Sequence, residues 1–329
     1  LRGWSIAGVD LFPVRVNAEG RLQLMRAARV KLDLEVDPAS NTQVRRRVDW
    51  PGVRDADAAM VSGVVRNPRE VELHAPPRGL DPSIAAVDFS VLQSGLAKVP
   101  RAVQGPVDYL IITSPALAGE FQRLADLRTQ EGLHTEIVTV DQIVADYRAG
   151  GDLQETIRLF LRHAHEEWGT SYLLLGGDAE IIPPRYARSR FYPVGSYTDI
   201  PTDLYFSCLD GNWNVDADGI YAEAYQDFLN TGDGADMLAE LSMGRNPLNT
   251  PGQVDAWVDK VVEYNAPSDP TTVGRSLFLS EVRFPQNWDG VSNPTLDGAV
   301  YSDNIIFNSI IGGSNLLQSW RLYENFPAY

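Results

Sequence analysis

The sequence predicts a mixed α/β fold, in which helices cover both faces of a parallel sheet, preceded by a small all-β segment. Three short apolar runs have the length and composition of buried strands: Tyr109–Thr113, Glu136–Val140 and Tyr172–Leu175. Segments with helical spacing of apolar residues separate these runs. Because the order is strand, helix, strand, helix, strand, right-handed crossovers would place the three strands parallel in one sheet.

Each separating helix has its own start or stop signal. After the first strand, Leu117, Phe121 and Leu124 recur at helical spacing, and Gly132 is suited to end the helix. The second helix is expected to begin after Asp152, with Glu155 completing a capping box. Its expected apolar stripe is Leu153, Ile157, Phe160, Leu161, Ala164 and Trp168.

A second round of strands and helices begins near residue 238. The run Leu241–Gly244 predicts a short strand, after which Thr250 caps a helix with Pro251 at its first position and Gln253 in the capping box. The expected buried face of this helix is Val254, Trp257, Val258, Val261 and Val262. Further on, the sequence predicts a strand at Ser276–Ser280, a helix at Asn304–Leu317 and the start of a strand at Arg321–Tyr323.

Residues 1–104 have a different pattern, so we expect a first domain there and a second at 105–329. Alternation around Val14–Val16 and Leu22–Leu24, with a turn signal at Asn17–Gly20 between them, predicts hairpins of a small sandwich. Residues 76–105 are rich in proline and glycine and are typical of a linker.

Composition and charge exclude several classes of protein. The 329 residues carry 28 basic and 44 acidic side chains, a net charge of −16, which argues against a nucleic-acid partner. No apolar run reaches the roughly 18 residues that a membrane-spanning helix needs. Residues 1–104 have a balance of 15 − 12 = +3 and residues 105–329 one of 13 − 32 = −19. The two segments either dock through opposite charge, or the second simply has an acidic solvated face.

Common catalytic motifs are missing from the sequence. There is no Gly-x-Gly-x-x-Gly after the first strand, no phosphate-binding lysine loop and no Gly-x-Ser-x-Gly elbow. His163 and His165 are two apart on a predicted helix, so they face different directions and are poorly placed to share a metal. Cys208 is the only cysteine, so an intrachain disulfide is excluded, and no spacing pairs it with a histidine.

The stretch from Asp210 to Gly219 is the best local signal for a ligand. Oxygen-bearing side chains alternate at Asn214, Asp216 and Asp218, and Gly219 permits a sharp turn, an arrangement that suits a hard cation such as calcium. The complete helix–loop–helix calcium pattern fails, because its twelfth position is a tyrosine. Glu223 and Asp210 are further candidate ligands. The alternative is an acidic turn without an ion.

Glu240 lies in the short apolar run Leu238–Met243. An acid in the interior of a strand needs a partner. It would either orient a catalytic histidine, or pair with Arg245, or lie on a solvated edge.

Taken in order, several segments resemble the gingipain-type cysteine peptidases. The resemblance is close over about residues 107–265 and looser after that. The segments are Tyr109–Thr113, Leu124–Leu133, Trp168–Arg185, Thr202–Phe206, Asp210–Trp213 and Met243–Pro247.

This resemblance implies a caspase-like α/β fold of two subdomains, of which the second is incomplete here. It also implies endopeptidase chemistry by a Cys–His pair, a structural calcium ion and export from a bacterial cell. Residues 1–104 look like the pro-region of such enzymes, and Arg101 is the expected processing site. Glu240 occupies the place of the family's acid before the Gly-Arg pair.

The sequence also departs from the family pattern. The family's histidine lies in a Gly-His-Gly strand, with the cysteine about thirty residues later, and these 329 residues contain no Gly-His-Gly. Cys208 matches a non-catalytic position. Gln253 aligns near the position of the acidic residue that the arginine-cutting members use in their specificity pocket. Because Gln253 is uncharged, the sequence does not support a preference for cleavage at arginine.

Two interpretations follow. In the first, the protein is a secreted, zymogen-like cysteine endopeptidase, acting on protein or peptide outside the cell or at the bacterial surface. Its dyad then lies beyond residue 329 or on a second polypeptide; a close variant is a peptidase or transpeptidase that trims sorting signals. In the second, it is a non-catalytic surface, assembly or binding protein on the same scaffold.

Overall fold

The structure is a computed structural model, and it divides the chain into two compact units, Leu1–Val258 and Asp259–Tyr329. The residues described are 14–16, 21–24, 53–75, 106–147, 151–191, 196–223, 233, 235, 237–267, 269, 271, 274–304 and 318–325.

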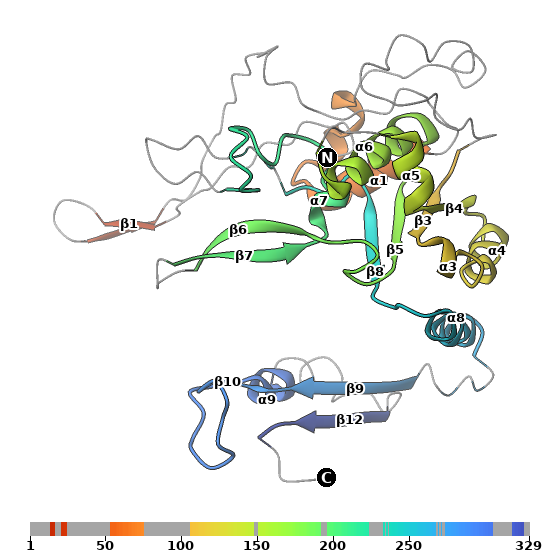
Figure 1. The fold of residues 1–329 in the computed structure, drawn as a ribbon. Coiled ribbons are helices and arrows are strands. Elements are labelled where there is room, and N and C mark those ends of the chain that lie inside the picture. The colour runs from red at the N-terminus through yellow and green to blue at the C-terminus, as the bar shows by residue number, and fades with distance from the viewer. Residues whose placement is uncertain are drawn as a thin grey trace. The chain divides into compact units, whose positions relative to one another are not determined.

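A parallel sheet forms the centre of the first unit (Figure 1). Its strands are β3 (Tyr109–Thr113), β4 (Thr135–Thr139), β5 (Tyr172–Gly176) and β8 (Ser242–Asn246), in the order β4-β3-β5-β8. Every neighbouring pair is parallel and in register, so the carboxyl ends of all four strands meet at one edge. The predicted α/β fold is confirmed, and the predicted strand at 241–244 begins and ends slightly later.

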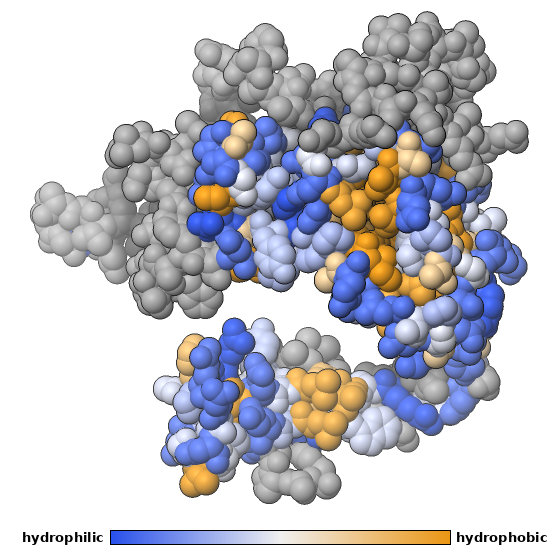
Figure 2. All heavy atoms as spheres, viewed as in Figure 1, coloured by the Kyte–Doolittle hydropathy of each residue, from blue (hydrophilic) through white to orange (hydrophobic). Residues whose placement is uncertain are grey.

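One face of this sheet is covered by α5 (Val140–Asp146) and α6 (Leu153–His163), which continues as a π-helical turn over Ala164–Trp168. The predicted stripe of α6 packs here, in one cluster with alternate residues of β3 and β5. Hydrophobic residues gather over the middle of the unit in Figure 2. The strand residues of this cluster are Leu110, Ile112, Leu173 and Leu175.

The opposite face is covered by the residues that follow β3. The predicted single helix is two, α3 (Pro115–Ala118) and α4 (Gln122–Gln130). Gly176 allows this packing, because a Cβ atom there would lie 2.7 Å from the ring of Phe121. That ring in turn meets Trp257 of α8 (Pro251–Asn265) edge to face at 6.4 Å. Both faces of the sheet are therefore covered, as parallel sheets require.

The helix starts follow the sequence signals in part. Thr139 and Gln142 form a capping box, so β4 ends at Thr139, one residue earlier than predicted. Asp152 caps α6 by accepting a hydrogen bond from the Glu155 amide at 2.9 Å. The other half of the predicted capping box, a hydrogen bond from the Asp152 amide to the Glu155 side chain, does not form. The Glu155 side chain accepts a hydrogen bond from the Tyr221 hydroxyl instead.

The start of α8 is as predicted, while its buried face is narrower. Gln253 Oε1 accepts hydrogen bonds from the amides of Asn249 and Thr250, and Thr250 Oγ1 accepts one from the Gln253 amide. Val254 and Val258 are buried, but Val262, expected on the same face, is exposed.

An antiparallel hairpin that the sequence did not predict follows β5. It consists of β6 (Arg185–Phe191) and β7 (Ser196–Thr202), and the short helix α7 (Leu204–Ser207) comes next. After α7 the chain enters the stretch from Cys208 to Glu223, which contains the predicted acidic loop.

In the second unit, β9 (Arg275–Ser280) pairs in parallel with β12 (Gln318–Tyr323). The sequence predicted both strands but not their pairing. β10 (Val282–Phe284) pairs with β11 (Leu296–Asp297), which leads into α9 (Gly298–Tyr301). The predicted helix at Asn304–Leu317 lies outside the described residues apart from Asn304.

One face of the β9–β12 pair is apolar and exposed, and Figure 2 shows a hydrophobic patch over these strands. Leu277 is in register with Trp320, and Leu279 with Leu322. Since partners in register point to the same side of a sheet, the four side chains share one face. All four are at least half exposed.

The first 104 residues are not all-β where the structure describes them. β1 (Val14–Val16) and β2 (Leu22–Leu24) form the predicted hairpin. However, α1 (Val53–Val64) is a helix, followed by 3-10 turns at Pro68–Glu70 and Glu72–His74, so the all-β expectation is wrong here. The buried residues of α1 recur every four positions, which is a helical period. The predicted linker and Arg101 lie outside the described residues.

Candidate functional site: the acidic loop and its anchor on helix α6

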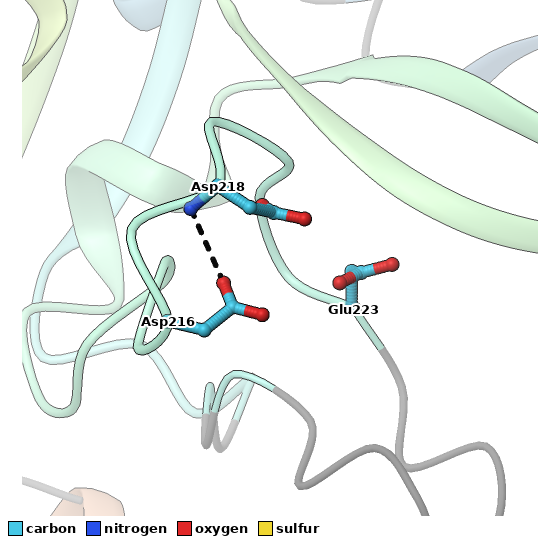
Figure 3. A group of neighbouring side chains, drawn as sticks. All are labelled: Asp216, Asp218 and Glu223. Atoms are coloured by element: carbon cyan, nitrogen blue, oxygen red, sulfur yellow. Dashed lines mark hydrogen bonds between the residues drawn. The ribbon is translucent and has the colours of Figure 1, made fainter.

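Three of the five predicted metal ligands come together in the acidic loop. Oxygens of Asp216, Asp218 and Glu223 all lie within 4.8 Å of one another (Figure 3). The loop is shaped by its own carboxylates: Asp216 Oδ1 accepts a hydrogen bond from the Asp218 amide at 3.3 Å, and Asp218 Oδ1 one from the Ile220 amide at 2.7 Å. Gly219 permits the turn with a φ of +86°. The cluster can offer a cation three carboxylates.

The other two predicted ligands are placed differently. Asp210 is buried and outside the carboxylate cluster, and its backbone oxygen accepts a hydrogen bond from Arg158 at 3.0 Å. Asn214 Oδ1 is a buried acceptor that no group in the described part of the chain bonds. Asn214 is therefore available as a neutral oxygen ligand. Asp210 instead helps to attach the start of the loop to α6, because its backbone oxygen bonds Arg158.

Asp233 supports the acidic loop, a role that the sequence analysis missed. Its buried carboxylate accepts hydrogen bonds from the amides of Val215 at 2.9 Å and Glu223 at 2.8 Å. These amides lie on either side of the acidic turn, so Asp233 ties the two ends of the loop together. Asp233 follows Glu223 by ten residues in a stretch without periodicity, and no local pattern signals this contact.

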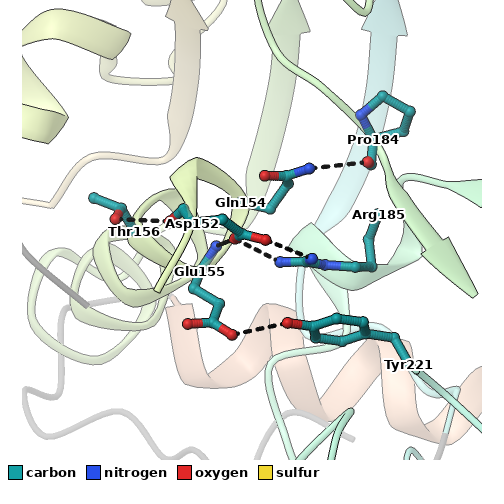
Figure 4. A network of polar contacts seen from close by, with 7 residues as sticks. All are labelled: Asp152, Gln154, Glu155, Thr156, Pro184, Arg185 and Tyr221. Atoms are coloured by element: carbon teal, nitrogen blue, oxygen red, sulfur yellow. Dashed lines mark hydrogen bonds and ion pairs between the residues drawn. The ribbon is translucent and has the colours of Figure 1, made fainter. Parts of the chain in front are cut away.

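Tyr221 connects the acidic loop to helix α6 (Figure 4). Its hydroxyl donates to Glu155 Oε1 at 3.0 Å, and its ring lies 3.8 Å from the guanidinium carbon of Arg185. Arg185 in turn holds Asp152. Burial, together with the hydrogen bond to Glu155, raises the pKa of Tyr221 to about 12, so the hydroxyl stays protonated and donates at physiological pH.

The chain leading into the loop is held from two sides. Arg158 of α6 donates to the backbone oxygens of Tyr205 at 3.1 Å and Cys208 at 2.9 Å, in addition to Asp210. From the other side, the fully buried Glu240 accepts a hydrogen bond from the Leu209 amide at 2.7 Å. The backbone that leads into the acidic loop is therefore fixed by hydrogen bonds from Arg158 and to Glu240.

The position of Glu240 differs from the expectation in one respect. It precedes β8 and does not lie within it, and because it is fully buried, a solvated edge does not describe it. Arg245 forms a fork with Asp203 at 2.7 and 2.6 Å. The role of Glu240 in orienting a histidine stays a prediction.

The lone cysteine is part of the hydrophobic core. Cys208 is fully buried in the same cluster as Leu209 and Trp213. A substrate cannot reach a sulfur atom that is enclosed in this way, which agrees with the expectation that Cys208 is not the nucleophile.

The two helical histidines have structural surroundings. His165 is buried, with Nδ1 3.1 Å from the backbone oxygen of Thr170. The ring of His163 meets those of Tyr147 and Trp168 edge to face at 5.9 and 5.7 Å. As predicted for residues two apart on a helix, the two rings have different neighbours.

A family model for peptidase family C25 matches residues 102–316, about two thirds of the chain. The chain belongs to this family. The membership confirms the predicted resemblance to gingipain-type cysteine peptidases. It covers the whole sheet, the hairpin β6–β7 and the acidic loop, so these elements belong to a protein of a cysteine peptidase family.

Solved structures similar to this C25 chain include two from Porphyromonas gingivalis. The complex of the RgpB pro- and mature domains is 18% identical, with a TM-score of 0.42, over 66% of this chain and 42% of that one. Dimeric latent PorU is 22% identical, with a TM-score of 0.33, over 50% and 16%. A further protease is 17% identical, with a TM-score of 0.37, over 54% and 32%. This chain thus spans less than half of each.

No curated protein matches the chain. Among the helices in the described ranges, none is both long and apolar enough to span a bilayer.

Proposed function

We propose that the chain forms the first part of the catalytic domain of a secreted cysteine endopeptidase that acts on proteins or peptides. The observation that carries this proposal is the parallel sheet β4-β3-β5-β8, which lies inside the region matched by the C25 family model. In open parallel sheets, ligands bind at the carboxyl ends of the strands. Here these ends are Thr113, Thr139, Gly176 and Asn246.

We place the Cys–His dyad outside these 329 residues, downstream or on a second polypeptide. The buried position of Cys208 and the lack of a Gly-His-Gly motif support this placement. In such a dyad the histidine takes the thiol proton, the thiolate attacks the scissile carbonyl carbon, and the proton passes to the leaving amine. Water then releases the acyl group.

The natural protein, with any residues that precede or follow this chain, provides the test. We expect it to cleave internally quenched peptides, to lose activity after thiol alkylation, and to keep activity when Cys208 is replaced by Ser. A natural protein that cleaves no peptide after calcium addition and proteolytic activation would instead support a non-catalytic protein on the same scaffold.

Glu240 is proposed as the acid that orients the histidine. Glu240→Gln keeps the shape and one acceptor oxygen but removes the charge. If Glu240 orients the histidine, this variant lowers kcat of the natural protein while its free energy of unfolding in urea stays within about 0.5 kcal/mol of wild type. A lower free energy of unfolding with unchanged kcat assigns Glu240 to the support of Leu209 alone, and removes it from the catalytic machinery.

We also propose that the acidic loop binds a structural calcium ion. Hard cations of this type take six to eight oxygen ligands at about 2.3–2.6 Å, preferably carboxylates, amides and water. Asp216, Asp218 and Glu223 supply the charged oxygens, and Asn214 Oδ1 supplies a buried neutral acceptor. An ion here would reduce the repulsion among the three carboxylates. It would also hold together the two sides of the loop on either side of Tyr221.

The segment 1–104 is proposed as a pro-region that keeps the enzyme latent until it is cut near Arg101. Its charge of +3 against −19 for the remainder supports docking by charge. We expect the natural protein to be cut near Arg101, and mass spectrometry of the fragments locates the cut. The released N-terminal fragment should bind the remainder more weakly as the salt concentration rises. Association that is insensitive to salt would contradict docking by charge.

A further inference from the structure

A cleft of about 340 Å³ lies between helix α6 and the acidic loop. It is near the lower end of the size range of small-molecule sites. Glu155 and Tyr221, which Figure 4 shows in contact, belong to its wall. The full lining is Glu155, Arg158, Leu159, Arg162, Tyr205, Asn212, Trp213, Asn214, Ala217 and Tyr221.

Two arginines one helical turn apart make the cleft cationic. Arg158 is 8% exposed, and its three hydrogen bonds go to uncharged backbone oxygens. Arg162 makes no hydrogen bond or ion pair with any described residue. Like charges at positions i and i+4 of a helix repel each other. An anion between the two guanidinium groups would remove this repulsion.

The wall of the cleft also contains an unused hydrogen-bond donor. Trp213 is 1% exposed, and within the described part of the chain its Nε1 has no acceptor. A buried donor without an acceptor is unfavourable, so such groups normally have a partner.

We propose that this cleft binds a carboxylate group, supplied by the side chain of an acidic residue in a peptide. The two guanidinium groups and the indole N–H are donors only, so their shared ligand is an acceptor, and a carboxylate accepts several such bonds at once. Leu159 and Ala217 offer apolar contact to the carbon atoms that carry it.

The charge of the surroundings favours a carboxylate over a phosphate. Glu155 lines the cleft, and Asp216 and Asp218 lie on the loop that forms one wall. A group with a single negative charge is repelled less by these three carboxylates than a phosphate, which carries nearly two charges at neutral pH. The cleft is separate from the carboxylate cluster in chemistry: it presents donors, whereas the cluster presents acceptors.

The test follows the indole N–H signal of Trp213 in the ¹⁵N-labelled 329-residue chain, with calcium held constant. Trp213→Phe assigns this signal. We expect a saturable downfield shift with the blocked peptide acetyl-Ala-Asp-Ala-amide, and none with acetyl-Ala-Asn-Ala-amide. Arg162→Gln should weaken the binding about fivefold, the effect of one partly exposed charge. Arg283→Gln, which removes an equal charge outside the cleft, should leave it unchanged.

Three results would each overturn the proposal. The first is the absence of a saturable shift with the aspartate peptide up to about 20 mM, which would be weaker than any useful affinity. The second is unchanged binding in the Arg162→Gln chain. The third is a shift with inorganic phosphate at an equal or lower concentration, which would assign the cleft to a different class of anion.

Discussion

Arg185 and Asp152 form a two-pronged ion pair, with Nη1 2.7 Å from Oδ2 and Nη2 2.7 Å from Oδ1. The pair joins the start of β6 to the first turn of α6, where the same aspartate caps the helix. Arg185 also lies over the rings of Tyr205 and Tyr221, at 4.5 and 3.8 Å. One guanidinium group thus connects the helix, the hairpin and the acidic loop.

Removing the charge of Asp152 should destabilise this junction. Asp152→Asn keeps a capping side chain but leaves Arg185, whose side chain is 6% exposed, without a carboxylate. Because the Asp152 side chain is 43% exposed, water screens the pair, and we expect a loss of about 1–2 kcal/mol in urea unfolding. Asp199→Asn, which breaks the more exposed pair with Arg188, is the matched control and should cost under about 0.5 kcal/mol. Equal losses in the two variants would contradict the assigned role.

The same pair predicts a pH dependence. Burial raises the pKa of Asp152, but the hydrogen bonds from Arg185 and from the Glu155 amide outweigh burial and lower it. A carboxyl group with a lowered pKa in the folded state contributes stability above its unfolded pKa of about 3.9, and this contribution is lost as pH falls through the folded pKa. The difference in unfolding free energy between wild type and Asp152→Asn should therefore shrink below about pH 4. A difference that is constant from about pH 3 to 7 would refute this.

Tyr221 contributes to the anchor in two separable ways. Tyr221→Phe removes the hydroxyl that bonds Glu155 and keeps the ring under Arg185, so we expect a loss of about 1 kcal/mol. Tyr221→Leu removes both contacts and should cost about 1–2 kcal/mol more. If Tyr221→Phe costs as much as Tyr221→Leu in urea unfolding, the stack on Arg185 has no role in holding the loop.

Calcium should stabilise the chain if the acidic loop binds it. At a concentration about a hundred times the Kd, one bound ion adds about 2.7 kcal/mol, which raises Tm by several degrees. The double variant Asp216→Asn, Asp218→Asn should lose this increase, whereas Asp269→Asn, at an exposed carboxylate in the second unit, should keep it. A Tm that chelator leaves unchanged in the wild-type chain would reject the calcium site.

The exposed apolar face of β9 and β12 predicts dye binding. Leu279 is 69% exposed, so Leu279→Lys should change the unfolding free energy by less than about 0.5 kcal/mol. It should lower the fluorescence of an apolar surface dye, because it places a charge in the middle of the patch. Val300→Lys, at an exposed position outside the face, is the control. Equal dye binding by both variants would show that the face is covered in solution.

Local signals account for the parts of the fold that were predicted. The runs at β3 and β5 are apolar throughout because both faces of a parallel strand are buried. Thr250 and Gln253 bond each other's backbone within one helical turn, so the start of α8 could be predicted from four residues.

The missed features depend on residues that are distant in the sequence. Glu155 was expected to complete a capping box, yet its partner is Tyr221, 66 positions away. Asp233 closes the acidic loop across 18 positions from Val215, within a stretch that has no periodic pattern. In helix α1 the buried positions are Val53, Asp57 and Val61, and because one of them is acidic, their helical period does not stand out as an apolar stripe. Such contacts depend on tertiary packing, which local propensity does not encode.

The central claim is that the chain belongs to a thiol peptidase whose nucleophile is outside these 329 residues. The most direct measurement is to react the natural protein with a peptide-based probe that alkylates catalytic thiols, digest it, and locate the label by mass spectrometry. We predict a label on a cysteine that is not among these residues, blocked by prior peptide substrate. A label on Cys208, or an intact protein without any labelled cysteine, would contradict the account.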